Sequence, residues 1–332
     1  MGEIDIRFGC PPPPAMRSSL SIASPALLGF VCGLVLLGGC RPASDAAPGA
    51  STEASEAPVS LRDSVLSPPD TTAARFEAAL ETAFSHRAST GSIGALMQEI
   101  GGHFRGRPYL TGTLDQPSTE TLVVRFDGFD CVTFVETALA LARSAQASDS
   151  TYAGFARRLA EHRYRKGGPV GYCGRLHYFT EWLTDNAARG HVRRLGADLE
   201  GRPLRDTLDF MSTHRAAYDR FATNDSLFAC IQEMETRLQT AHRRAPVRYV
   251  PQDSIRAVYD QLRAGDIVAL VSPLDGLDVA HTGLVYAHPD GGRGLLHASL
   301  SDGVVVSPDL QRYVQTIDRQ IGMVVARPQP VR

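Results

Sequence analysis

The amino-acid sequence predicts an α+β fold in which a helical first half precedes an antiparallel sheet. The first observation is that apolar residues recur at helical spacing in the first half, as Phe76, Leu80 and Phe84 do. The second is that the chain after Pro246 consists of short β-branched runs separated by Gly, Pro and Asp, which is typical of strands. Because helices and strands are segregated along the chain, we expect one domain over residues 71–328.

The helical half contains several candidate elements. Residues 72–101 predict two helices with a break near Ser89, and residues 131–145 predict a strongly apolar, buried helix. Three more helices are expected, at residues 151–162, 175–187 and 225–241. One short strand is expected at residues 121–126 (TLVVRF). The strand half contains five runs: DIVALVS, DVAHTGLVYAH, RGLLHAS, GVVVS and IGMVVARP.

Length and composition are those of a protein with a substantial core. The chain has 332 residues, of which 43% are hydrophobic and 21% are charged, and its formal net charge is −2. A surface that binds nucleic acid carries a basic face, whereas the arginines of this chain are scattered along the sequence. Nucleic acid is therefore not an expected partner.

The first 70 residues lie outside the predicted fold. Residues 16–40 combine Arg17, an apolar run and small residues before Cys40, which is the layout of a secretory signal. The final LGGC resembles a lipobox, so we expect residues 1–40 to be a signal peptide, Met16 its true start and Cys40 the lipidated residue. A transmembrane anchor is the alternative, because the run is just long enough to span a bilayer.

Residues 41–70 consist mainly of Ala, Ser, Pro, Glu and Thr, and we expect them to form a disordered tether. The residue after Cys40 is Arg41 and not Asp, which by resemblance to Gram-negative lipoproteins favours the outer membrane. The sequence therefore predicts a cell-envelope lipoprotein that faces the periplasm and contacts the membrane through its N-terminal lipid.

Three cysteines fall within the predicted domain: Cys131, Cys173 and Cys230. An odd number leaves at least one cysteine outside any disulfide. Cys173 and Cys230 are either a disulfide, which an oxidising periplasm permits, or two buried thiols. The sequence has no CxxC pair and no HExxH cluster, so neither a metal nor another cofactor is expected.

Cys131 is the candidate nucleophile because of its place in the segment FDGFDCVTFVE. Asp130 is a good N-cap residue and would put Cys131 in the first turn of the apolar helix. The helix dipole and the N–H groups of that turn stabilise a thiolate over a thiol. A small buried thiol at a helix start is the alternative, and the histidines of the strand half argue against it.

His281 and His297 lie on two successive predicted strands, 16 positions apart. If these strands pair as antiparallel neighbours, the two imidazoles can lie side by side. One histidine could then be the base for Cys131, while the second binds the far ring nitrogen and fixes its tautomer.

The motifs also carry a family resemblance. GRPYLTGTL, FDC, AGDIVAL, AHTGLVY and LLHAS resemble elements of the NlpC-type papain-like peptidases and amidases that trim peptidoglycan. DCVTFVETALALA, GRLHYFTEW and LDVAHTG resemble more closely the N-acetylmuramoyl-L-alanine amidase-like family, over residues 75–327. The resemblance implies a papain-like fold with Cys131 as nucleophile, His281 as base, His297 as orienting residue and Tyr109 beside the thiol.

The resemblance further implies hydrolysis of the amide between N-acetylmuramic acid and L-alanine in peptidoglycan fragments. DCVT departs from the commoner DCSG of the wider superfamily, which argues against the usual γ-D-glutamyl-diamino acid endopeptidase specificity without excluding it. An acyltransferase of papain-like fold and a non-catalytic wall-binding lipoprotein are the alternatives from other classes.

Residues in GRLHYFTEW are candidate substrate contacts. Arg175, Tyr178 and Trp182 would share one face of the predicted helix, and His177 lies among them. An arginine for a carboxylate and aromatic rings for a sugar would suit a muropeptide cleft. Aromatic packing on the core, with Arg175 in a structural ion pair, is an equally favoured interpretation.

Overall fold

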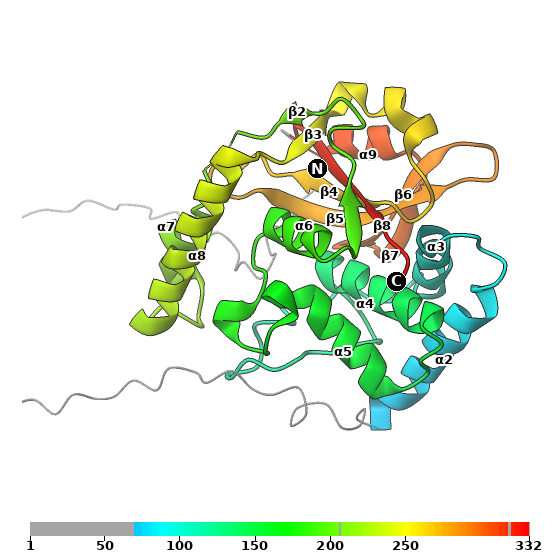
Figure 1. Cartoon of the computed structure of the whole chain (residues 1–332), viewed down its shortest axis with the longest axis horizontal. Coiled ribbons are helices and arrows are strands. Elements are labelled where there is room, and N and C mark those ends of the chain that lie inside the picture. Colours follow the sequence, from blue (N-terminus) through cyan, green and yellow to red (C-terminus); the bar gives the residue numbers. More distant parts are fainter. Residues whose placement is uncertain (1–69, 206, 318–319, 332) are drawn as a thin grey trace, which may run out of the picture.

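Figure 1 shows a computed structural model of the protein, which describes residues 70–205, 207–317 and 320–331. The predicted signal peptide, the predicted lipidation site Cys40 and the predicted tether as far as residue 69 lie outside the described residues. Within the described ranges, no helix combines the length and the apolar character that crossing a bilayer requires.

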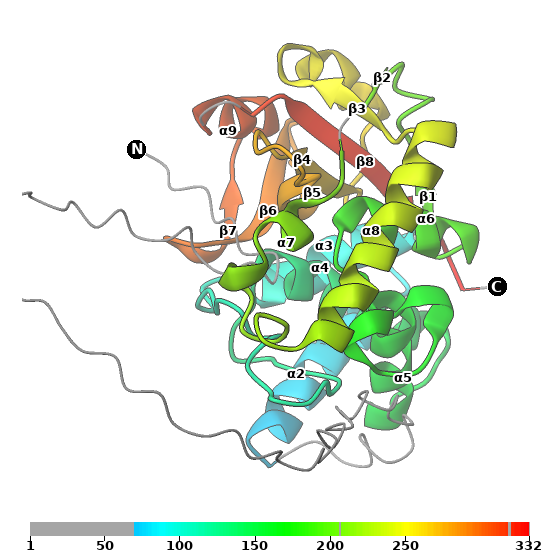
Figure 2. The same cartoon turned by 90° about the vertical axis from the view of Figure 1, so that its left-hand side faces the viewer.

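The helices of the first half match most of the predictions from sequence. They are α2 (Asp70–His86), α3 (Ile93–His103), α4 (Cys131–Gln146), α5 (Tyr152–Arg163) and α6 (Phe179–Ala188). Beyond them, α7 (Phe210–Thr213) and α8 (Asp225–Arg244) lie together at one side of the molecule (Figures 1 and 2). The predicted helices at 72–101, 131–145, 151–162 and 225–241 are confirmed.

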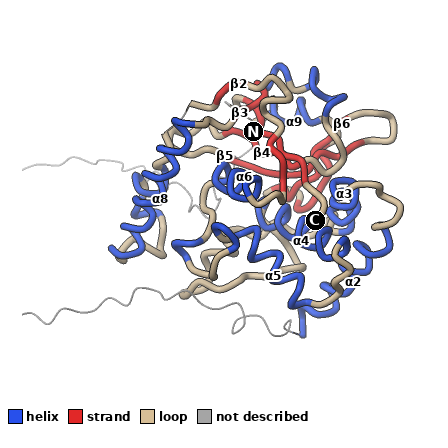
Figure 3. The backbone as a smooth tube through the Cα atoms, viewed as in Figure 1, coloured by secondary structure: helices blue, strands red, loops and turns tan. Residues whose placement is uncertain are grey.

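The strands form one antiparallel sheet, as the sequence predicts. In the described residues the order is β2 (Arg202–Pro203), β3 (Arg248–Pro251), β8 (Gly322–Pro328), β4 (Ile267–Val271), β5 (Val279–Ala287), β6 (Arg293–Ser299) and β7 (Gly303–Ser307), with β1 (Val192–Arg194) also on β8. Figure 3 shows the strands between the larger helices, such as α3, α4 and α5, and the short helices that include α9. The α+β class is therefore confirmed.

Strand β4 shows why the sheet is buried on both faces. Ile267, Ala269 and Val271 belong to the apolar cluster around α4, whereas Val268 and Leu270 belong to a second cluster. Side chains alternate between the two faces of a strand, so a run of five apolar residues fits only where both faces are covered. The second face is covered by α9 (Leu310–Thr316) and by the 3-10 turns between β3 and β4.

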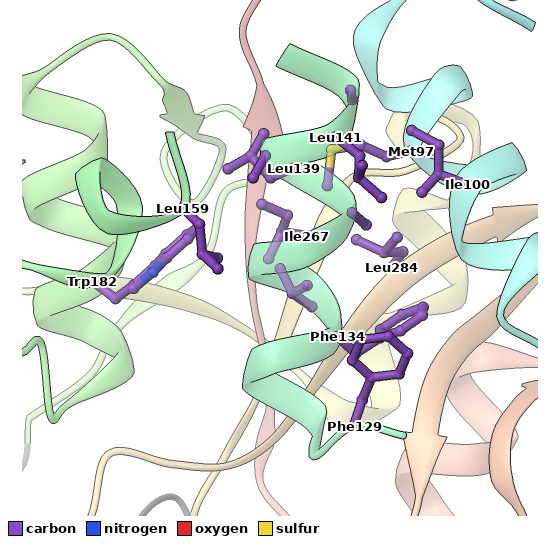
Figure 4. Close-up of a cluster of buried hydrophobic side chains, with 14 of the residues drawn as sticks. Met97, Ile100, Phe129, Phe134, Leu139, Leu141, Leu159, Trp182, Ile267 and Leu284 are labelled. Carbon is purple, nitrogen blue, oxygen red and sulfur yellow. The ribbon is translucent and has the colours of Figure 1, made fainter. Parts of the chain in front are cut away.

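Helix α4 is the centre of the core. Figure 4 shows Phe134, Leu139 and Leu141 of this helix packed between Ile267 and Leu284 of the sheet and the helices α3, α5 and α6. All three α4 side chains are completely buried. Because α4 has no solvent-exposed face along most of its length, its first turn is held rigidly against the sheet.

The predicted strand at 121–126 is wrong. The segment has no regular secondary structure in the described structure, and side chains, not a neighbouring strand, bind two of its backbone carbonyls. Arg163 Nη1 donates to Val123 O at 2.6 Å, and the Tyr164 hydroxyl donates to Thr121 O at 3.4 Å.

The helix predicted at 175–187 begins four residues later, at Phe179. Arg175 has an extended backbone (φ −63°, ψ 144°) and lies in an isolated bridge opposite Tyr164. The N–H of Leu176 donates to Arg163 O at 2.9 Å, so this stretch runs beside the end of α5. The expectation that Arg175, Tyr178 and Trp182 share one helical face is therefore wrong.

Cys173 and Cys230 form a disulfide and are not two separate buried thiols. Cys173, in the 3-10 turn Tyr172–Gly174, is bonded to Cys230 of α8. The bond ties the segment before α6 to α8, although the two cysteines lie 57 positions apart in the sequence.

Candidate active site

Cys131 is the first residue of α4, and Asp130 is its N-cap, as the sequence predicts. Thr133 N–H donates to Asp130 Oδ1 at 2.7 Å, and Asp130 N–H donates to Thr133 Oγ1 at 3.0 Å. This reciprocal capping box fixes the helix start at Cys131. The thiol therefore lies where the N–H groups of the first turn and the helix dipole favour negative charge.

The hydrogen bonds of the Asp130 carboxyl all serve to cap α4 and to fix the residues around its first turn. The carboxyl is buried, it accepts a further hydrogen bond from Thr113 Oγ1 at 3.3 Å, and its burial raises its pKa against the opposing effect of the Thr133 hydrogen bonds. Such a group anchors the helix start. Cys131 is itself only 2% exposed.

The two histidines form a hydrogen-bonded pair, as the strand pairing predicts. His281 Nε2 lies 2.8 Å from His297 Nδ1, and the rings are nearly perpendicular at 85°. His297 Nε2 lies 3.0 Å from Ser307 Oγ on β7. One chain of hydrogen bonds thus runs across three neighbouring strands, from β5 through β6 to β7.

This chain restricts the tautomers. His281 Nε2 is occupied by His297, so Nδ1 is the nitrogen of His281 that remains for chemistry. If Nδ1 is to accept a proton, Nε2 must carry the hydrogen and donate it to His297 Nδ1. His297 then carries its own hydrogen on Nε2 and donates to Ser307. All three partners are satisfied in this arrangement.

Burial keeps both imidazoles neutral. It lowers the pKa of half-buried His281 to about 4 and that of His297 well below its usual range, where the neighbouring His281 adds to the effect. Desolvation penalises the charged form of a histidine. At neutral pH the pair is therefore uncharged, and His281 has a basic nitrogen available.

Two contacts relate the cysteine to the histidines. Thr282 Oγ1, next in sequence to His281, donates to the backbone carbonyl of Cys131 at 2.8 Å, across 151 positions of sequence. Tyr313 of α9 has its ring centre 4.7 Å from that of His297 and 6.1 Å from that of His281. Negative charge on Cys131 raises the pKa of Tyr313, after the larger effect of burial. Cys131 and both histidines therefore lie around Tyr313 in one part of the molecule.

Tyr109 lies close to the helix start. It forms an isolated parallel bridge with Phe129, and the N–H of Leu110 donates to Phe129 O at 3.0 Å. Phe129 precedes Cys131 by two residues, so the backbone places Tyr109 in the neighbourhood that the sequence predicts. Its role toward a substrate stays a prediction.

A small cavity of about 40 Å³, lined by both apolar and charged side chains, adjoins the start of α4. Its lining includes Asp130 and Val132, on either side of Cys131 in the sequence, together with Arg175 and His177. The volume holds a few water molecules or one small chemical group.

Arg175 is 3% exposed and is committed to ion pairs. Its guanidinium pairs with Asp115, lies 3.4 Å from Glu120, donates to Leu114 O at 2.8 Å and lies over the Tyr172 ring at 4.8 Å. These contacts match the structural interpretation of Arg175. Its charge is balanced within the protein, so a role toward a substrate carboxylate stays a prediction.

The two residues after Leu176 differ in their surroundings. His177 Nε2 donates to Tyr172 O at 2.8 Å, and burial lowers the pKa of His177 well below its usual range. Tyr178 is 2% exposed, and its hydroxyl donates to Glu235 Oε1 at 2.8 Å and accepts from Met211 N–H. His177 lines the cavity, whereas Tyr178 joins the α7–α8 core, so these contacts give the predicted substrate role of Tyr178 no support.

Three site residues carry too weak a sequence signal to be predicted. Thr282 and Ser307 lie on predicted strands, and the two-residue period would have allowed Ser307 to be considered as a partner of His297. Tyr313 lies on α9, for which the sequence gives no clear helical pattern.

Within the described ranges, no group of three or more His, Cys, Asp and Glu side chains is arranged to hold a metal ion.

Solved structures with this fold include known and suggested hydrolases. An N-acetylmuramoyl-L-alanine amidase from Bacteroides uniformis is 29% identical, with a TM-score of 0.66 over 72% of this chain and 100% of that one. A suggested xylanase from Bacteroides fragilis is 33% identical, with a TM-score of 0.63 over 68% of this chain and 98% of that one. A Legionella pneumophila protein at 19% identity and a TM-score of 0.56, covering 78% of this chain and 97% of that one, shows the fold alone.

These likenesses define an α+β protein of amidase-like type. The family model of the AmiA-like, N-acetylmuramoyl-L-alanine amidase-like proteins matches residues 99–323, which is more than half of the chain. The protein therefore belongs to the N-acetylmuramoyl-L-alanine amidase-like family. No protein of curated function matches it.

Proposed function

We propose that this protein is a cysteine amidase of papain-like architecture that cleaves the bond between N-acetylmuramic acid and L-alanine in peptidoglycan fragments. Cys131 is the nucleophile, His281 the base and His297 the residue that orients the base. The observation that carries the proposal is the pairing of a capped helix-start cysteine with a hydrogen-bonded His–His–Ser chain on the adjoining sheet. Family membership and the Bacteroides uniformis neighbour support the choice of bond.

The first half-reaction is acylation. The Cys131 thiol transfers its proton to His281 Nδ1, and the sulfur adds to the carbonyl carbon of the lactyl–alanine amide. The carbonyl electron pair moves to oxygen, and N–H groups of the first turn of α4 are well placed to stabilise that oxyanion. When the intermediate collapses, the C–N bond breaks and protonated His281 gives its proton to the alanine nitrogen.

The second half-reaction is deacylation. His281 Nδ1, neutral again, takes a proton from water, whose oxygen adds to the thioester carbonyl. Collapse of this intermediate breaks the C–S bond and releases the muramic acid carboxyl group, and protonated His281 returns its proton to the sulfur, which restores the thiol and the neutral base. His297 holds the imidazole in the tautomer that both steps need, because its Nδ1 accepts the Nε2 hydrogen of His281.

The proposed substrate contacts are Tyr109, Arg175 and His177. The cavity lined by Arg175 and His177 borders Val132, the residue after the nucleophile, so a group bound to Cys131 would have this cavity as a neighbour. The proposed substrate is peptidoglycan-derived, in keeping with the family.

We further propose that the protein is an outer-membrane lipoprotein, anchored through Cys40 and facing the periplasm. The Cys173–Cys230 disulfide supports an oxidising compartment. Metabolic labelling with an alkyne fatty acid, followed by membrane fractionation, should place label and protein together in the outer membrane. A Cys40→Ser variant should lose both, and an unlabelled, soluble wild type would refute the anchoring.

The test of activity uses a defined disaccharide-tetrapeptide, with reducing and anhydro ends, incubated with the purified chain and analysed by mass spectrometry. Release of intact disaccharide and free tetrapeptide is expected from the wild type and is expected to be absent for Cys131→Ala and for His281→Asn. His288→Asn is the matched control, since His288 directly follows β5 and its imidazole bonds to Pro308 O, away from the proposed site.

Other products would change the proposal. A cut within the peptide would keep the cysteine mechanism and make the protein an endopeptidase. No cleavage by folded protein on either substrate would refute the amidase function. Full activity of Cys131→Ala would refute the cysteine mechanism while leaving the choice of bond intact.

A further inference from the structure

A third aromatic ring covers the histidine pair. Tyr313 is half-buried on α9, and its ring centre lies 4.7 Å from His297 and 6.1 Å from His281. The ring packs at the edge of the apolar cluster that includes Leu310 and Val314 of the same helix. Helix α9 therefore holds Tyr313 firmly, with one side against the core and the other at the two imidazoles.

The Tyr313 hydroxyl makes no hydrogen bond to another described residue, in contrast to two other tyrosines of the protein. Tyr259, in the same cluster, donates to Asp309 Oδ1 at 3.2 Å and accepts from Gln311 N–H at 2.8 Å. Tyr178 likewise bonds to Glu235. No protein hydrogen bond is found for the Tyr313 hydroxyl over the described ranges. It is a donor that remains available beside the site.

The charge around Tyr313 favours its neutral form. Burial raises the pKa of this phenol, and negative charges on Cys131 and on Asp302 raise it further. A phenol in this environment stays protonated at any pH at which the enzyme would work, so it can donate a hydrogen bond. Thr282, next to His281 in the sequence, bonds to Cys131 O, so the start of α4 adjoins the histidine pair that Tyr313 covers.

We propose that Tyr313 is a catalytic residue whose hydroxyl donates a hydrogen bond to the oxyanion formed when Cys131 adds to the amide carbonyl. The proposal rests on the amidase function proposed above and adds a residue to it. As the C–S bond forms, the carbonyl π electrons move to oxygen, and the Tyr313 O–H stabilises this negative charge without giving up its proton. The same hydroxyl serves the second intermediate, in which water has added to the thioester.

The position of Tyr313 suits this role. An oxyanion forms within a bond length of the carbon that sulfur attacks, so a useful donor must lie beside both the thiol and the base. Tyr313 packs beside the rings of His281 and His297, and its neighbour in the site, His281, adjoins Thr282, which bonds to Cys131 O. A side-chain donor here would complement the N–H groups of the α4 first turn, which approach from the helix.

The test is Tyr313→Phe, which keeps the ring and removes only the hydroxyl. Loss of one oxyanion donor lowers kcat by roughly 100- to 1,000-fold in other enzymes, so a fall of at least about 10-fold is expected here, with KM little changed. The matched control is Tyr286→Phe. Tyr286 is also half-buried, and its ring lies 4.8 Å from a histidine ring, that of His288, at the far end of β5. This control should keep wild-type kcat, and both variants should keep the wild-type Tm.

A second measurement separates oxyanion stabilisation from a merely structural role. Iodoacetamide alkylates a thiolate without forming an oxyanion, so the rate at which it modifies Cys131 reports only on the thiol and its base. We expect Tyr313→Phe to alkylate at the wild-type rate, within about two-fold, while its amide hydrolysis falls. A parallel loss of both rates would mean that Tyr313 positions the histidines, and the oxyanion role would be overturned.

The failures of the two proposals are distinguishable. Wild-type turnover of the muropeptide with an unaffected Tyr313→Phe would overturn the Tyr313 role alone. Wild-type protein that alkylates at Cys131 but hydrolyses no muropeptide would overturn the proposed function and the Tyr313 role together.

Discussion

Removal of the Cys173–Cys230 disulfide should destabilise the protein by about 4 kcal/mol at most. The bond closes a loop with a sequence separation of 57. In the chain-entropy treatment, a loop of that length lowers the entropy of the unfolded chain by roughly 14 cal/mol/K, which is about 4 kcal/mol at 25 °C. Since domains are stable by only about 5–15 kcal/mol, this loss would be a large part of the total.

The native structure should survive the loss of the bond. Besides the disulfide, Tyr178 on the segment after Cys173 bonds to Glu235 of α8 at 2.8 Å, and its ring packs in the α7–α8 cluster. The same two parts of the chain therefore remain joined by packing and by a buried hydrogen bond. We expect the effect to fall on the unfolded state, which gains freedom, and not on the folded geometry.

The assay is urea unfolding of a Cys173→Ala, Cys230→Ala double variant beside the wild type. Trp182, the single tryptophan of the chain, is 1% exposed and stacks on Phe179 at 5.0 Å, so its fluorescence reports unfolding. Wild type in reductant should match the variant, and reductant should leave the variant unchanged. A loss of stability below about 1 kcal/mol, or a non-native tryptophan signal without urea, would refute the reasoning.

Two further predictions follow from the buried histidines. Ser307→Ala leaves the Nε2–H of His297 without its acceptor. Because one hydrogen bond contributes about 1 kcal/mol, the variant should have a kcat roughly five-fold lower in steady-state assays. An unchanged kcat would contradict the proposed series of hydrogen bonds from His281 to Ser307. Burial lowers the pKa of His162 well below 6.5 and that of His191 to about 4, so both take up a proton mainly on unfolding. Their contribution to stability is complete above pH 6.5 and is lost as the pH falls, by about 1.4 kcal/mol per histidine at pH 5.5. Urea unfolding at pH 5.5 and 7.5 measures this loss as the difference between the two free energies of unfolding. His191→Gln should make that difference smaller by about 1.4 kcal/mol. The same difference in wild type and variant would argue against the linkage.

Elements with a strong local pattern could be predicted from sequence. Helix α4 has both an unmistakable cap residue, Asp130, and an apolar run, so its first residue was identifiable as Cys131. Strands β4–β8 are short β-branched runs between turn residues, and their order along the chain implied antiparallel pairing. The contact between His281 and His297 followed from that pairing, because successive antiparallel strands bring their side chains together.

Elements that depend on distant partners could not be predicted. The extended stretch at Arg175 resembles a helix in its sequence, but backbone pairing with the end of α5 and the ion pairs with Asp115 and Glu120 hold it extended. The TLVVRF segment at 121–126 has the composition of a strand, yet side-chain donors from the end of α5 bind two of its carbonyls. Local propensity is a weak preference, and tertiary contacts override it.

The sequence by itself determined the α+β class and the capped start of α4, since each depends on residues close together in the chain, and its motifs indicated the three candidate catalytic residues. The tertiary structure alone decided that Thr282, Ser307 and Tyr313 surround them, and that Cys173 is bonded to Cys230. The physical reason is that strand register and helix packing set the direction of each side chain. Residues as far apart as Cys131 and Thr282 meet only when the whole core forms.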